Sequence, residues 1–211
     1  MVLASFVLLG ALGVVVFANP SSDEAPVTSS GFEGSLRPEV VPTDFTLKDQ
    51  DGKKVSLSDF KGEPLILTFM YSTCKDTCPL QANQIRGALD RLGDNAVPSL
   101  AVSVDPVDDT PDRAKRFLVQ RRLSGRMQFL LGDRAQLAPI WKEYGIQPQG
   151  KAFDHSAYVL VLDAKGRQRV SFPVAHLTPE GLAHDVRVLQ REQTRAASAS
   201  AAASARSTAA T

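Results

Sequence analysis

Hydrophobic and polar positions alternate where the folded part of the chain begins. Two short segments, Asp44-Phe-Thr-Leu and Lys54-Val-Ser-Leu, show this alternation, and Asp51-Gly52 lies between them. A period of two on both sides of a turn predicts an antiparallel β-hairpin. Residues 64–71 follow and are apolar on both faces. This pattern is typical of a buried central strand.

Helical and strand patterns then alternate toward the end of the chain. We expect further strands over residues 98–104, 127–131, 157–163 and 168–172, and helices from Pro79 to Gly93, 111–122, 134–144 and from Pro179 onward. Strands joined by crossover helices predict a three-layer α/β domain with a central sheet and an N-terminal hairpin. In such sheets the working site lies at the carboxyl ends of the strands.

The chain ends have different compositions from this domain. The run from Val2 to Phe17 is apolar, and with Ala18 it would extend about 26 Å as a helix. It lacks a basic segment before it, so we interpret residues 1–18 as a retained membrane anchor, with a cleaved signal segment as the alternative. Residues 19–41 are predicted to form a flexible linker, residues 42–193 the domain, and residues 194–211 a disordered tail.

Length and charge limit the number of domains and the classes of binding partner that fit the chain. The chain has 211 residues, 43% of them hydrophobic, and a formal net charge of +1. One globular domain fits this length, and the near-neutral charge gives no indication of nucleic-acid binding. No Lys or Arg precedes Arg37. This is the pattern expected on the translocated side of a membrane, so we expect the domain to face the periplasm or an equivalent intermembrane space.

Both cysteines lie where the buried strand is expected to end and a helix to begin. Cys74 and Cys78 are four positions apart. A helix N-terminus favours a thiolate, which can act as a nucleophile or as a metal ligand. Cβ atoms at this spacing on a helix lie roughly 5 to 6 Å apart, whereas a disulfide needs about 3.5 to 4.5 Å. The spacing therefore suits a metal chelate and still permits a strained disulfide.

The three histidines differ in their expected surroundings. His184 is placed in the last helix and His176 in a linking turn, and we interpret both as structural residues. His155 ends a long loop before a strand, so position alone leaves its role open between structure and metal binding.

Three further motifs give the chain a family resemblance. The segments are Thr73-Cys-Lys-Asp-Thr-Cys-Pro79, Ser103-Val-Asp-Pro-Val-Asp-Asp-Thr-Pro111 and Asp154-His155-Ser156, and the hairpin with Asp51-Gly52 supports them. In this order and spacing, residues 41–189 resemble the Sco/SenC family of copper chaperones. Lys75 departs from the proline that is usual in the family. This departure leaves the ligand set intact and places a cation beside the thiolates, which bears on their redox tuning.

The resemblance implies a fold, a ligand set and a partner. It implies a membrane-tethered thioredoxin-like domain that binds one copper ion, as Cu(I) or Cu(II), through Cys74, Cys78 and His155. Asp105 is implied to lie behind the ligands or to contact the partner. That partner would be a copper-bearing subunit of a cytochrome oxidase during its assembly. Two thiolates and an imidazole form a soft set that suits this metal.

An enzymatic alternative remains open. In a thiol-disulfide oxidoreductase, Cys74 would be the nucleophile and Cys78 the resolving thiol, and the copper-site cysteines of the partner subunit would be reduced. The usual redox motif has two residues between its cysteines, whereas this chain has three. A peroxidase is less well supported, because peroxiredoxins place Thr three residues before the reactive cysteine and this chain has Tyr71 there.

Overall fold

A six-stranded mixed sheet lies at the centre of the molecule. The computed structural model describes residues 31–39, 41–148 and 157–209. The sheet strands have the order β1-β8-β7-β4-β5-β6, and their bounds are β1 Ser35–Leu36, β4 Leu65–Met70, β5 Ser99–Ser103, β6 Gln128–Leu130, β7 Tyr158–Leu162 and β8 Gln168–Pro173. A separate hairpin consists of β2 Thr46–Lys48 and β3 Lys54–Ser56. The helices are α1 Thr77–Leu92, α2 Pro111–Gln120, α3 Arg134–Tyr144 and α4 Pro179–Ala209, with 3-10 turns at η1 Leu57–Phe60, η2 Gly93–Asn95 and η3 Val174–His176.

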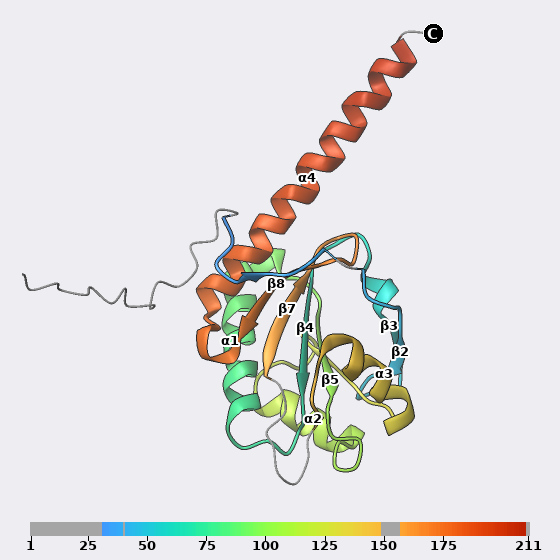
Figure 1. Ribbon diagram of the computed structural model, residues 1–211. Helices are drawn as coiled ribbons and strands as arrows, with labels where there is room; N and C mark the ends of the chain where they lie inside the picture. Colours follow the sequence, from blue (N-terminus) through green and yellow to red (C-terminus); the bar gives the residue numbers. More distant parts are fainter. Residues whose placement is uncertain (1–30, 40, 149–156, 210–211) are drawn as a thin grey trace, which may run out of the picture.

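The directions of the strands determine where the chain leaves the sheet after β4 and after β5. β4 is parallel to β5, and β5 is parallel to β6, whereas β7 and β8 run antiparallel to their neighbours. The carboxyl ends of β4 and β5 therefore lie side by side, with Met70 paired to Ser103. Figure 1 shows both strands pointing away from the end of the domain where α4 projects.

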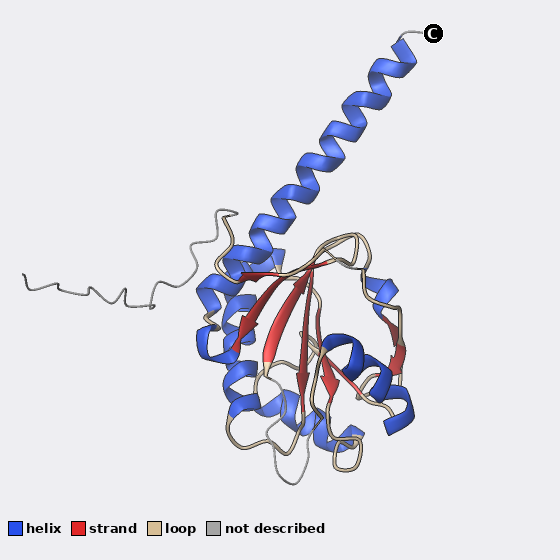
Figure 2. Ribbon diagram, viewed as in Figure 1, coloured by secondary structure: helices blue, strands red, loops and turns tan. Residues whose placement is uncertain are grey.

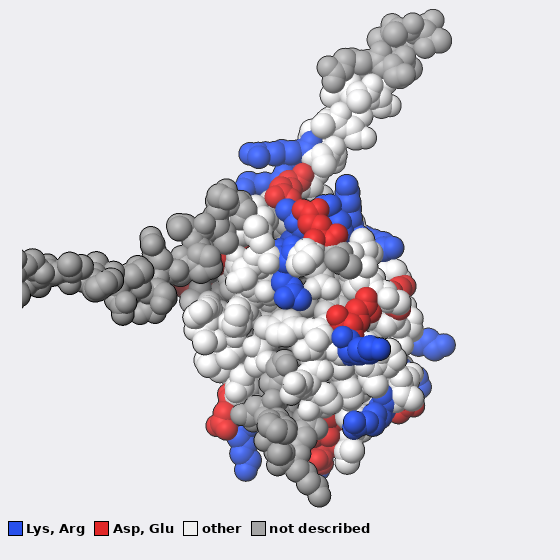
Figure 3. Space-filling view, viewed as in Figure 1, with Lys and Arg blue, Asp and Glu red and all other residues white. Residues whose placement is uncertain are grey.

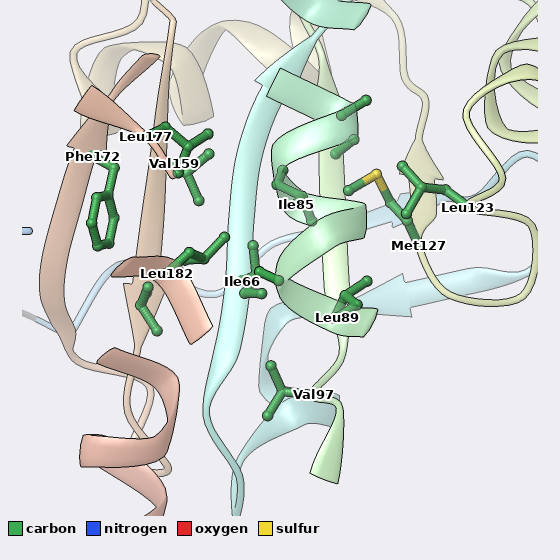
Figure 4. Packing of buried hydrophobic residues seen from close by; sticks show 14 of the residues in the cluster. Ile66, Ile85, Leu89, Val97, Leu123, Met127, Val159, Phe172, Leu177 and Leu182 are labelled. Carbon is green, nitrogen blue, oxygen red and sulfur yellow. The ribbon is translucent and has the colours of Figure 1, made fainter. Parts of the chain in front are cut away.

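Two hydrophobic cores make the domain three-layered (Figure 2). On one face of the sheet, Ile66 of β4 packs with Ile85 and Leu89 of α1 and with Leu182 of α4, as Figure 4 shows. The other face is covered by α3 and the β2–β3 hairpin. β4 contributes to both cores, and all six of its residues are buried. The predicted α/β fold with a mixed sheet and an N-terminal hairpin is confirmed.

Local sequence signals fix the helix ends that border the site. Thr110 caps α2 by accepting a hydrogen bond from the Arg113 backbone N–H at 3.3 Å, and Pro111 is the first helical residue. Asp133 forms a reciprocal capping box with Gln136 at the start of α3. Gly145 ends α3 with a φ of 65°, a left-handed conformation that glycine adopts without a side-chain clash.

The predicted linker extends too far into the domain and is corrected by the structure. Strand β1 pairs with β8, and Phe32 is buried against the first core. The backbone N–H groups of Glu33 and Gly34 donate to the buried carboxylate of Asp185 on α4, at 2.8 and 2.9 Å. A strand of two residues is too short to show an alternation of polar and apolar positions, so the sequence gives no indication of this pairing.

The prediction of a disordered tail after residue 193 is also corrected. Helix α4 continues to Ala209 and projects from the domain (Figure 1). Alanine has the highest helix propensity, and a helix that is already nucleated by packed residues extends at little cost. The predicted membrane anchor, residues 1–18, lies outside the described residues. Among the helices that are described, none has the length and apolar character needed to cross a membrane.

Candidate metal centre

The two cysteine side chains meet at the carboxyl end of the central strand. β4 ends at Met70, a short loop carries Cys74, and α1 begins at Thr77, which places Cys78 in the first helical turn. The Cys78 backbone N–H points to the Cys74 sulfur, with an N to Sγ distance of 3.3 Å. The Cys74 backbone N–H donates to the carbonyl oxygen of Tyr71 at 3.3 Å, which tightens the loop. The Cys74 sulfur therefore accepts a hydrogen bond from a backbone N–H group in the first turn of α1.

The two thiols differ in access to solvent. Cys78 is fully buried against Ile85 and other core residues, whereas Cys74 is half-buried, and both are free thiols. The hydrogen bond with Cys74 raises the pKa of the Cys78 thiol, and burial raises it further. The negative charges of Cys74 and Asp109 act in the same direction. For Cys78 these interactions act against the thiolate that a helix N-terminus favours.

The predicted third ligand, His155, lies outside the described residues. Within the part of the chain that is described, no group of three or more His, Cys, Asp and Glu side chains is placed to hold a metal ion. The chain re-enters the described structure at Ala157, and β7 begins at Tyr158. The Tyr158 carbonyl oxygen accepts a hydrogen bond from Nε2 of Gln81 at 3.0 Å. Gln81 is on α1, three residues after Cys78, so the start of β7 is tied to the helix that carries this cysteine.

The other two histidines have surroundings that agree with the structural interpretation. His176 is exposed in the turn η3. His184 lies on α4, where its Nδ1 is 3.0 Å from Oδ1 of Asp185. Neither residue is on the loop after β4 or on α1.

Asp109, rather than Asp105, connects the loop between β4 and α1 to the end of β5. We call this loop, residues 71–76, the cysteine loop. Oδ1 of Asp109 accepts hydrogen bonds from the backbone N–H and the hydroxyl of Ser72, at 2.7 and 2.6 Å. Oδ2 of Asp109 accepts one from the Ser103 hydroxyl at 2.6 Å. Asp109 is 8% exposed, and burial raises the pKa of its carboxyl group. It therefore holds the segment two residues before Cys74 against the end of β5.

Asp105 instead shapes its own turn. Its Oδ1 accepts from the backbone N–H groups of Val107 and Asp108, both at 3.2 Å. In the sequence, Asp109 resembles an ordinary turn former, because it is an acidic residue directly before Thr110-Pro111. The signal that could have identified it is its spacing: Ser103 ends a buried strand, and a turn of six residues brings Asp109 back to that hydroxyl.

Comparisons with known proteins agree with this geometry. A family model described as SCO1/SenC matches residues 33–191. The chain is 36% identical over 100 residues to the SCO1 protein homolog of Bacillus subtilis, which is 46% of this chain and 51% of that protein. It is 32% identical over 134 residues to a chloroplastic peroxiredoxin Q of Triticum aestivum, which is 63% of this chain and 57% of that protein. The matches thus span little more than half the length of these two relatives.

Comparison with a solved structure agrees with the family match. The fold is similar to that of copper-bound ScoI from Bradyrhizobium japonicum, with a TM-score of 0.62 and 31% identity. The similarity covers 71% of this chain and 99% of the ScoI chain. The family model begins at residue 33, beside the first strand of the sheet, and ends within α4. From this match across most of the chain and from the shared fold, we conclude that the protein belongs to the SCO1/SenC family.

Proposed function

We propose that this protein is a membrane-tethered copper chaperone. It binds one copper ion, as Cu(I) or Cu(II), through Cys74, Cys78 and His155, and delivers the ion to a copper-bearing subunit of a cytochrome oxidase during assembly. Residues 1–18 act as the tether, and the domain faces the periplasm or an equivalent intermembrane space. If the first segment is cleaved instead, the domain is released into the periplasm.

The observation that carries the proposal is the contact between the two cysteines. The Cys74 sulfur lies 3.3 Å from the Cys78 backbone nitrogen at the end of β4, and both thiols are reduced. Two thiols that converge in this way provide two soft donors of the kind that bind Cu(I). The similar ScoI structure from Bradyrhizobium japonicum has copper bound, which supports copper as the cargo of this chain.

The surroundings of the two sulfurs support a separate role for each cysteine. Cys74 is partly accessible and would meet the incoming ion first. Cys78 is buried with a raised pKa, so its proton must leave when it binds the metal. Asp109 keeps the loop in place through Ser72 while this exchange occurs. We infer that copper loading is coupled to the release of the Cys78 proton.

His155 completes the proposed ligand set. The hydrogen bond between Gln81 and the Tyr158 carbonyl fixes the start of β7 beside α1. Tyr158 follows His155 by three positions, and three extended residues span at most about 11 Å. This short connection supports His155 as the third ligand of a site built on Cys78.

A Cu(I) titration of the reduced protein tests the ligand set. A colour-forming Cu(I) chelator would compete with the wild type and with Cys74→Ser, Cys78→Ser and His155→Ala. We expect each substitution to weaken binding by at least about 100-fold, more than changes outside a ligand shell usually do. His176→Ala is the matched control and should bind as the wild type does. If His155→Ala and His176→Ala bind equally well, His155 is not a ligand.

The accessible Cys74 beside a buried Cys78 also favours a second function, thiol-disulfide exchange. The Cys74 thiolate would attack a disulfide of the oxidase subunit and form a mixed disulfide, releasing one thiolate of that subunit. The Cys78 thiolate would then attack the Cys74 sulfur, releasing the second thiolate. The partner gains two electrons, and this chain is left with a Cys74–Cys78 disulfide that a cellular dithiol must reduce again.

Activity of the metal-free protein separates the two functions. Copper-free protein would be mixed with an oxidised copper-site peptide and an excess of dithiol. Turnover well above that of the dithiol alone, lost in Cys74→Ser, would make the protein an oxidoreductase. For the chaperone, we expect no rate enhancement without copper and transfer of one copper ion to the reduced peptide.

The tether is tested by fractionating cells. Full-length protein should stay with the membranes after an alkaline wash, with its N-terminus intact. A soluble protein that begins near Asn19 would show a cleaved segment.

A further inference from the structure

A row of arginines follows one face of α4 where this helix leaves the domain. Arg187, Arg191 and Arg195 are spaced by four residues, so they lie on the same side of the helix. Together with Gln190 and Thr194 they line one surface hollow of about 370 Å³. All three arginines are exposed. We call this surface the arginine groove.

The groove is anchored to the domain on one side and open on the other. A guanidinium nitrogen of Arg187 donates to the carbonyl oxygen of Arg91, and Nε2 of Gln190 donates to that of Asn95 at 2.9 Å. These contacts place the groove beside the carboxyl-terminal end of α1. Arg191 and Arg195 make no ion pair within the described part of the chain.

Two acidic residues of α4 form ion pairs with other parts of the domain. Glu192, on α4 itself, forms an ion pair with Arg169 at 2.8 Å, and Glu180 pairs with Arg91. Figure 3 shows basic side chains gathered at the base of the projecting helix, with acidic ones among them, and an uncharged surface farther out. Residues 196–205 of that outer part contain only Ala and Ser. Between residues 187 and 205 of α4, the positively charged residues are therefore the three arginines of the groove.

Guanidinium groups in this arrangement match the chemistry of phosphate esters. Each guanidinium offers a planar pair of N–H donors to two oxygens of one phosphate group. Near an anionic membrane, each arginine strengthens binding by about five-fold, so three together give about 100-fold. The groove thus has the charge and the donors for anionic lipid headgroups.

The N-terminal segment enters the domain close to the groove, so a membrane that holds this segment would lie near the groove. Glu33 and Gly34 are held by Asp185, which precedes Arg187 by only two residues on α4. Residues 19–32 connect this point to the proposed anchor and reach at most about 50 Å when extended. A tether that short keeps the groove at a high local concentration relative to the headgroups.

We propose that the arginine groove of α4 binds the phosphate groups of anionic phospholipids in the membrane that holds the chain. This inference rests on the tether in the proposed function and adds an orientation to it. From Arg91, beside the groove, to Cys78, helix α1 rises about 20 Å. The carboxyl ends of β4 and β5 lie at the end of the domain opposite the projecting part of α4 (Figure 1). Lipid binding would therefore present the cysteines away from the bilayer.

Protection of the Ala-rich part of α4 from a protease tests the proposal. The full chain is placed in nanodiscs of neutral phosphatidylcholine, with or without 30% phosphatidylglycerol, and digested with elastase, which cleaves after small residues. We expect cleavage within residues 196–205 to be about 10-fold slower or more in the anionic discs. Salt at 0.5 M should remove the protection, because exposed charges are screened over about 4 Å at that ionic strength.

Variants with matched charge changes separate the groove from general electrostatics. The variant R187E/R191E/R195E should lose the protection, and so should the milder R191Q/R195Q, which leaves the Arg187 contact with α1 intact. The control K53E/R116E/R134E reverses three exposed charges on other elements and should keep it. Equal cleavage in both kinds of disc for the wild type would overturn the proposal. Protection by inorganic phosphate in neutral discs, or only by an added oxidase subunit, would also overturn it.

The proposed membrane tether and the proposed lipid binding by the groove can be tested separately. Co-elution of the chain with the neutral nanodiscs reports the tether alone. If the chain does not co-elute, flotation with anionic vesicles replaces the digestion. Salt-sensitive flotation lost in R187E/R191E/R195E would then support the groove without the tether, and no flotation would overturn both.

Discussion

Removing the Asp109 carboxylate should loosen the cysteine loop and weaken copper binding. In Asp109→Ala, the buried Ser103 hydroxyl loses its acceptor, which costs about 1 to 3 kcal/mol. The two donors of half-buried Ser72 can bind water instead, so they add about 0.5 kcal/mol each. The substitution also removes the cost of burying a carboxylate, which is reflected in its raised pKa. We expect a net loss of about 2 kcal/mol in the free energy of unfolding.

Two measurements check this expectation. For a chain of this size, a loss of about 2 kcal/mol lowers the melting temperature by roughly 4 to 8 °C. Copper affinity should fall by about 10- to 100-fold, as for other changes just outside a ligand set. Asp109→Asn keeps an acceptor for Ser72, so its affinity should stay within about three-fold of the wild type.

Asp105→Ala provides the control that can refute the reasoning. Within the described part of the chain, the Asp105 carboxylate accepts only two long hydrogen bonds, both from its own turn. We therefore expect a loss of less than about 1 kcal/mol and an unchanged copper affinity. If Asp105→Ala weakens copper binding more than Asp109→Ala does, Asp109 does not hold the cysteine loop.

Three further outcomes follow from particular contacts. The raised pKa of Cys78 means that the native thiol keeps its proton above about pH 8.5, where the unfolded thiol ionises. Denaturant titrations of metal-free protein should therefore lose about 1.4 kcal/mol per pH unit more than Cys78→Ala does in that range. Gln81→Leu should change stability by less than about 1 kcal/mol, because Thr68 still donates to the Tyr158 carbonyl and the unpartnered Oε1 leaves the core; a larger loss in thermal denaturation would contradict this. In Gly34→Ala, the new Cβ would meet the Phe172 ring at 2.8 Å, so limited proteolysis should cut near β1 faster, with a stability loss of about 1 to 3 kcal/mol.

Elements with a local signal could be predicted from the sequence. The hairpin, the buried strand β4 and helix α3 follow from alternation, apolar runs and capping residues, and their observed bounds lie within about two residues of the expected ones. The position of Cys74 and Cys78 at the end of β4 followed in the same way. Such features depend on neighbours in the chain, which the sequence displays directly.

Features that depend on distant partners could not be predicted. Docking of β1 requires the Asp185 carboxylate, which is about 150 positions away and has no local pattern. Asp109 and Asp105 have the same residue type in the same turn, and only the returning Ser103 and Ser72 hydroxyls distinguish them. The raised pKa of Cys78 likewise depends on the hydrogen bond with Cys74 and on burial by packed helices, and packing by distant segments has no local pattern.

The geometry of the cysteines links the two proposed chemistries. Copper binding and disulfide formation both require Cys78 to release its proton, and both use the sulfurs of Cys74 and Cys78. A disulfide therefore excludes copper, and a bound copper ion protects both thiols from oxidation. Because Cys78 is buried and Cys74 is partly exposed, an oxidant or a partner disulfide reaches Cys74 first. We infer that release of copper to a partner is the moment at which the Cys74 thiolate becomes available for disulfide exchange.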